Sequence, residues 1–109
     1  MDLNQIADEA ALDAALDAPA FLLFKHSLIC PTSAQAFNEY RHYLNEHGDA
    51  VPTAWIDVRG QRPLSQKVEA ATGVRHESPQ ALLVKGGQVV WHASHGSITR
   101  DSLRDAATG

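Results

Sequence analysis

The sequence predicts an α/β protein in which a mixed four-stranded sheet is flanked by helices. The run at residues 20–26 is apolar on both faces, which is typical of a strand buried in the middle of a sheet. A helical pattern and a second strand-like run follow it, as in a β-α-β crossover. Further on, two apolar runs are joined by Gly86-Gly87, which predicts a hairpin and therefore antiparallel strands.

Each element is predicted from a local pattern of residues. The first helix is rich in Ala, Asp and Leu, and later helices carry apolar side chains at helical spacing. Helix ends are indicated by Pro19, Gly48 and Gly73, and Thr99 is a candidate N-cap. Pro52 lies near a strand start, where proline is tolerated. In chain order we expect a helix at 3–16, strands at 20–26 and 51–58 around a helix at 32–47, a short helix at 64–71, strands at 81–85 and 88–92, and a final helix after residue 99.

This order of elements is that of a thioredoxin-like fold, in which the reactive cysteine follows the first core strand and begins the next helix. Cys30 occupies that place. The length of 109 residues fits one compact domain, so a single thioredoxin-like domain is expected over residues 1–109.

Composition excludes several classes of function. The formal net charge of −4 argues against a nucleic-acid-binding surface, which needs a basic patch. No apolar stretch approaches the roughly 20 residues that span a bilayer. The polar, acidic N-terminus lacks the pattern of a signal peptide, and a lone cysteine is unusual in a small secreted domain. A cytoplasmic protein without membrane contacts is therefore expected.

Cys30 is the only cysteine, and it opens the segment Cys30-Pro31-Thr32-Ser33. Unpaired N–H groups and a partial positive charge at a helix N-terminus favour the thiolate, the form that attacks disulfides. Without a second cysteine, redox chemistry must pass through a mixed disulfide with another molecule. Pro31 suits the first helical position, and the Ser33 hydroxyl would either donate to the thiolate or cap the helix. The competing interpretation of Cys30 is an inert core cysteine.

A second landmark is Ser78-Pro79, just before the predicted hairpin. In thioredoxin-like proteins a cis-proline at this point faces the active cysteine, so we predict a cis bond here; a trans proline opening a strand is the alternative. The backbone around Ser78 would then be free to pair with an extended thiol or peptide.

Histidines and arginines provide further candidates. His76 could face the thiol, and His26 would either acidify it when protonated or pack at the sheet edge. No histidine pair has a recognised metal-ligand spacing, so no metal site is expected. Arg62 and Arg75 could attract the carboxylates of an anionic thiol, although solvated surface charge is the simpler interpretation.

Four segments together carry a resemblance to a known family: His26-Ser-Leu-Ile-Cys-Pro-Thr-Ser33, Arg62-Pro-Leu-Ser65, Gly73-Val-Arg-His-Glu-Ser-Pro-Gln80 and Trp91-His-Ala-Ser-His95. From about residue 20 to the last helix, the chain resembles the monothiol bacilliredoxins. Two positions depart from the family's pattern. Ile29 stands where a polar residue is usual, and Gly96 where an aromatic residue is usual.

The resemblance implies an enzyme that removes bacillithiol, a small cytosolic thiol, from protein mixed disulfides. Cys30 would attack the bacillithiol sulfur, with Pro31, Thr32, Ser33, His76, Ser78 and Pro79 forming or supporting the groove for the thiol. Bacillithiol would act as co-substrate, S-bacillithiolated proteins would be the partners, and a second bacillithiol or a partner redoxin would regenerate Cys30. The alternatives are a non-enzymatic thioredoxin-like adaptor and a glutaredoxin-like protein that uses another low-molecular-weight thiol.

Overall fold

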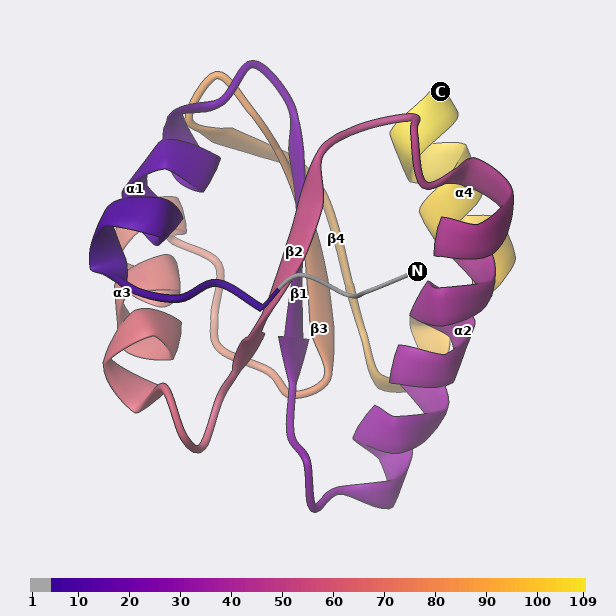
Figure 1. Cartoon of the computed structure of the whole chain (residues 1–109), viewed down its shortest axis with the longest axis horizontal. Coiled ribbons are helices and arrows are strands. Elements are labelled where there is room, and N and C mark those ends of the chain that lie inside the picture. The colour runs from indigo at the N-terminus through magenta and orange to yellow at the C-terminus, as the bar shows by residue number, and fades with distance from the viewer. Residues whose placement is uncertain (1–4) are drawn as a thin grey trace.

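A computed structural model describes residues 5–109 and contains a central sheet between two layers of helices (Figure 1). The strands are β1 (Phe21–His26), β2 (Thr53–Asp57), β3 (Gln80–Lys85) and β4 (Gln88–Ser94). Their order in the sheet is β2-β1-β3-β4. β1 is parallel to β2 and antiparallel to β3, and β4 is antiparallel to β3. The predicted mixed four-stranded sheet, with the first strand inside it, is confirmed.

The helices divide between the two faces of the sheet (Figure 1). They are α1 (Glu9–Asp17), α2 (Pro31–His47), α3 (Arg62–Thr72) and α4 (Arg100–Thr108), and a short 3-10 helix, η1 (His95–Ser97), connects β4 to α4. α1 and α3 cover one face, whereas α2 and α4 cover the other.

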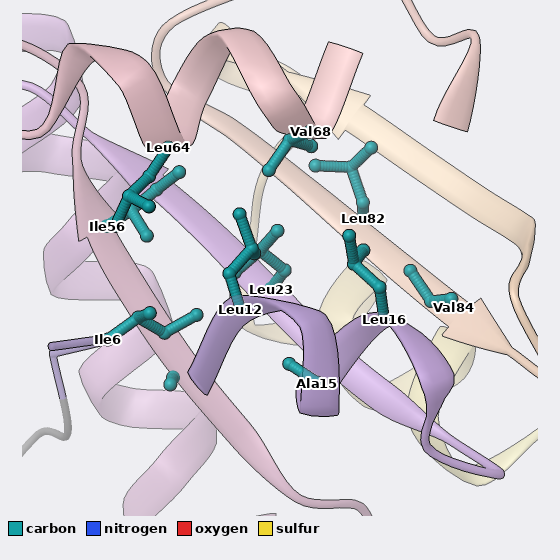
Figure 2. Close-up of a cluster of buried hydrophobic side chains, with 11 residues drawn as sticks. Ile6, Leu12, Ala15, Leu16, Leu23, Ile56, Leu64, Val68, Leu82 and Val84 are labelled. Carbon is teal, nitrogen blue, oxygen red and sulfur yellow. The ribbon is translucent and has the colours of Figure 1, made fainter. Parts of the chain in front are cut away.

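Side chains of β1 alternate between two hydrophobic cores, as strand geometry requires. Leu23 contributes to the core under α1 and α3, where Leu12 and Val68 are buried with it (Figure 2). Phe24 points to the opposite face and stacks on Tyr40 of α2 with ring centroids 4.7 Å apart. Because β1 is buried on both faces, the position and direction of the chain that leads to Cys30 are fixed.

Turn and cap residues confirm most of the predicted boundaries. Gly73 ends α3 with a φ of 73°, in the left-handed region that glycine adopts without cost. Gly86 and Gly87 also have positive φ values in the hairpin turn. Thr99 caps α4 and forms a reciprocal capping box with Ser102.

The predicted start of the first helix is wrong. α1 begins at Glu9, because the Asp8 side chain accepts a hydrogen bond from Ala11 N–H and so caps the helix there. Before it, the Ile6 N–H donates to the Trp55 carbonyl oxygen at 2.8 Å, which continues the edge of the sheet beside β2. The first two residues of the predicted range, 3 and 4, lie outside the described part of the chain.

Within residues 5–109, no helix has the length and apolar character needed to cross a membrane.

Candidate active site

One edge of the sheet gathers the residues that the sequence singles out. The carboxyl ends of β1 and β2 and the amino end of β3 meet there, because Lys25 of β1 is paired with Gln80 of β3. We call it the cysteine edge. The loop to Cys30 leaves β1 at this edge, and Pro79 enters β3 at the same edge. η1 joins them, since His95 N–H donates to the Pro79 carbonyl oxygen at 3.1 Å.

Cys30 is half-buried and is the N-cap residue of α2. Pro31 occupies the first position of the helix, as predicted, and there its missing N–H has no consequence. Among the side chains of residues 5–109, none caps this helix end. The amides of Thr32 and Ser33 have no acceptor within residues 5–109, so they remain available to a negative sulfur. The local backbone thus offers what a thiolate requires.

Ser33 joins the cysteine loop to the end of β1. Its Oγ accepts a hydrogen bond from Ser27 N–H at 2.8 Å and lies 2.7 Å from Nδ1 of His26. The side chain is fully buried. Among the described residues its hydrogen bonds therefore go to the strand end, and it does not cap α2 as one of the two sequence-based interpretations proposed.

His26 is an aromatic packing residue in this environment. Its ring stacks on Phe37 at a centroid distance of 4.1 Å and meets Trp55 edge-on at 5.5 Å. Burial lowers the pKa of His26, and the nearby carboxylate of Asp57 only partly opposes this shift. Burial therefore disfavours the imidazolium form of His26, which fits the packing interpretation better than that of a cation beside the thiol.

The Ser78–Pro79 peptide bond is cis, as predicted. Pro79 is buried, and the Ser78 hydroxyl is buried without a hydrogen-bond partner among the described residues. The backbone N–H and C=O of Ser78 also make no hydrogen bond within residues 5–109. Both groups are thus available to an extended ligand at the cysteine edge.

His76 turns toward α3. The ring Nδ1 of His76 lies 3.2 Å from the Ser65 Oγ. The backbone N–H of His76 donates to the Glu69 carboxylate at 2.7 Å. Partial burial and the positive charge of Lys25 lower the pKa of His76, against the effect of Glu69 and Glu77. No described hydrogen bond links His76 to Cys30.

Lys25 is a residue of this edge that the sequence analysis missed. It is fully buried, and its Nζ donates to the Gln80 side chain at 3.1 Å. Gln80 in turn donates to the Arg75 carbonyl oxygen at 3.0 Å, which ties the lysine to the loop before Pro79. Burial lowers the pKa of Lys25 to about 8, although Glu69 and Glu77 oppose the shift. A charged residue inside an apolar run was the signal that could have revealed it.

The two candidate arginines differ in where they lie. Arg62 lines a pocket at the start of α3, together with Arg59, which the sequence analysis did not consider, whereas Arg75 does not line it. Within residues 5–109, no three His, Cys, Asp or Glu side chains are grouped so as to hold a metal ion.

These features define the class of protein: a thioredoxin-fold oxidoreductase with a single thiol, Cys30, at the start of α2. The model of the family described as "Monothiol bacilliredoxin BrxC" matches residues 2–103. The chain belongs to the monothiol bacilliredoxin family.

Solved structures agree on the fold. One described as a putative oxidoreductase with a thioredoxin fold shares 30% identity, covers 95% of this chain and 92% of its own, and superimposes with a TM-score of 0.86. A thioredoxin of Malassezia sympodialis is 17% identical, with 98% and 89% coverage and a TM-score of 0.78. A mutant thioredoxin from Halobacterium salinarum is 21% identical, with 97% and 88% coverage and a TM-score of 0.74.

Proposed function

We propose that this protein is a cytoplasmic monothiol exchanger that removes bacillithiol from protein mixed disulfides through Cys30. The observation that carries the proposal is the position of the chain's one thiol, half-buried at the uncapped N-terminus of α2. Membership of the bacilliredoxin family supports bacillithiol as the thiol that is exchanged. The chain acts as a single domain in this proposal.

The reaction is a thiol–disulfide exchange. The Cys30 thiolate attacks the bacillithiol sulfur of the mixed disulfide, a new S–S bond forms to Cys30, and the protein sulfur leaves as a thiolate that takes up a proton. A second bacillithiol, or the thiol of a partner redoxin, then attacks the Cys30 adduct. Each step forms one S–S bond and breaks one, so no further oxidant or reductant is needed.

The surrounding residues have separate roles in this reaction. The N–H groups of Thr32 and Ser33 stabilise the sulfur anion at the helix start, next to Pro31. Ser78 and Pro79 form the opposite wall, where the free backbone of Ser78 pairs with the extended substrate. His76 supports this wall through its bonds to α3.

The test uses a reporter protein that carries bacillithiol on one cysteine. Wild-type protein is expected to release the reporter thiol and to gain a bacillithiol adduct on Cys30, which intact-protein mass spectrometry detects. Cys30→Ser should form no adduct and should not restore the reporter. Equal, poor restoration by both proteins would exclude the enzyme and favour an adaptor.

A second arm identifies the small thiol. The same reporter carrying glutathione or cysteine is compared with the bacillithiol-labelled one at equal concentrations. Faster transfer from bacillithiol supports the proposal, whereas preference for another label would assign the protein to a different thiol system.

A further inference from the structure

A surface pocket of about 440 Å³ lies at the amino-terminal end of α3. It is lined by Val58 and Arg59 after β2, by Arg62, Ser65, Gln66 and Glu69 from α3, and by His76 from the loop before Pro79. The volume falls within the range of small-molecule sites, and most of the lining side chains are polar. Of its lining residues, only His76 has a role in the exchange described above, as a support for the wall formed by Ser78 and Pro79.

Two guanidinium groups give the pocket its chemistry. Arg59 and Arg62 are exposed, and within residues 5–109 neither forms an ion pair. Elsewhere on the surface, in contrast, Arg100 and Arg104 are paired with carboxylates. A guanidinium fork matches a carboxylate in shape and charge, so the two arginines provide an anion site without an internal counter-ion.

The acidic residue in the lining is already engaged. One carboxylate oxygen of Glu69 accepts the backbone N–H of His76 at 2.7 Å, which closes the pocket wall. Lys25 is buried on the face of β1 that bears Leu23, the face covered by α3, and its charge acts on both Glu69 and His76. It adds positive charge beneath the pocket.

The turn that carries the arginines is held in place by hydrogen bonds. Asp57 Oδ1 accepts the N–H groups of Arg59 and Gly60, each at 3.1 Å. The Gln61 side chain accepts from Asp57 N–H at 3.0 Å and donates to the Ile6 carbonyl oxygen at 2.6 Å. Such bracing lowers the ordering cost of ligand binding.

The pocket lies at the cysteine edge. Val58 N–H donates to the His26 carbonyl oxygen at 3.0 Å, and Cys30 follows His26 by four residues. His76, another lining residue, precedes Pro79 by three residues. We propose that this pocket binds the carboxylate-bearing end of the small thiol whose sulfur reacts with Cys30, through Arg59 and Arg62. The inference rests on the proposed function and assigns the residues that select an anionic thiol over an uncharged one.

The test compares two labels on one single-cysteine reporter peptide: bacillithiol, which is anionic, and 2-mercaptoethanol, which is uncharged. The measured quantity is the second-order rate constant for transfer of the label to Cys30. We expect Arg59→Gln/Arg62→Gln to lower it about tenfold for bacillithiol, as for the loss of one or two charge-assisted bonds, and to leave 2-mercaptoethanol transfer nearly unchanged. Arg41→Gln, at an exposed position of α2, is the matched control and should affect neither.

Three results would overturn the inference. Equal losses for both labels would mean that the arginines act on the fold or on Cys30 itself, and no loss would make them solvated surface charges. If the decrease in rate depends on acidic residues added to the reporter peptide and not on the label, the pocket binds the protein partner instead.

A binding measurement separates this inference from the proposed function. Reduced bacillithiol is titrated calorimetrically into the Cys30→Ser protein, which cannot exchange. The arginine substitutions are then added to the Cys30→Ser protein. If binding weakens about tenfold with Arg59→Gln/Arg62→Gln and not with Arg41→Gln, the result supports the pocket even if transfer to Cys30 fails. Equal affinity for Cys30→Ser and for both of its derivatives, or no binding to any of them, overturns the inference.

Discussion

Ser33 is the third residue of α2, yet its side chain bonds to the end of β1 and not to its own helix. Its hydroxyl bonds backward to Ser27 N–H and His26, and so it fixes the turn that presents Cys30. Ser33→Ala leaves the Ser27 N–H without a partner in a buried site. We expect this change to lower the free energy of unfolding by about 1–3 kcal/mol, measured by urea denaturation.

Ser97→Ala is the control for that measurement. Ser97 is exposed in η1 and its side chain makes no described hydrogen bond, so its removal should change stability by no more than about 0.5 kcal/mol. If Ser33→Ala were as stable as Ser97→Ala, the network would not hold the loop.

Single residues differ in how well the sequence predicts them. Cys30 and Pro79 follow from their order relative to strands, and the structure places both at one edge of the sheet. Lys25 was absorbed into an apolar run, because periodicity gives the burial of a strand and not the partner, Gln80, that makes a buried ammonium tolerable. The pocket arginines depend on a turn whose shape no local pattern predicts.

The loop between β1 and α2 exposes two apolar side chains next to the thiol. Leu28 is 63% exposed and Ile29 is 69% exposed. Because these side chains would be buried only against a large partner, we expect Leu28→Thr/Ile29→Thr to slow transfer from a labelled protein about three- to tenfold. Transfer from a small 2-mercaptoethanol disulfide should be unchanged, as measured by mass spectrometry of Cys30.

Val90→Thr provides the matched control, since Val90 is 55% exposed on β4, away from the cysteine edge. An equal decrease for protein and small-molecule substrates would show that the loop governs Cys30 reactivity and not partner contact.

Elements with strong local signals were predicted well. The hairpin follows from two glycines and α4 from the Thr99 cap, because each signal acts on its own few residues. The start of α1 failed because a tertiary contact decides it: Ile6 N–H bonds to Trp55 on a strand that lies far along the sequence. The alanine-rich composition favours a helix, and it does not show that the chain at Ile6 would pair with the strand instead.

The arrangement of the whole molecule follows from burying β1 at the centre of the sheet. Leu23 and Phe24 point to opposite cores, and the same alternation sends Lys25 under α3 and His26 under α2. The order of elements predicted this sheet. That order says nothing of the partners that hold the polar side chains of Lys25 and His26 in the interior.

Lys25 makes the stability of the whole molecule depend on pH. Its pKa is about 8 in the folded protein and 10.5 for an unperturbed lysine. Below pH 8 both states carry the charge, so the cost of burying it is constant. Between these values the unfolded state binds more protons than the folded state, and the free energy of unfolding rises by about 1.4 kcal/mol for each pH unit.

We therefore compare wild type with Lys25→Met in urea unfolding at about pH 8 and about pH 9.5. The stability of wild type relative to the variant should rise by about 2 kcal/mol over this interval. Tyr40, whose pKa burial raises, is present in both proteins, so its effect cancels, as does the pH-independent loss of the Gln80 partner. Lys85→Met, at an exposed position of β3, should show no such rise. A constant difference between wild type and Lys25→Met would mean that the buried ammonium keeps its proton throughout this range.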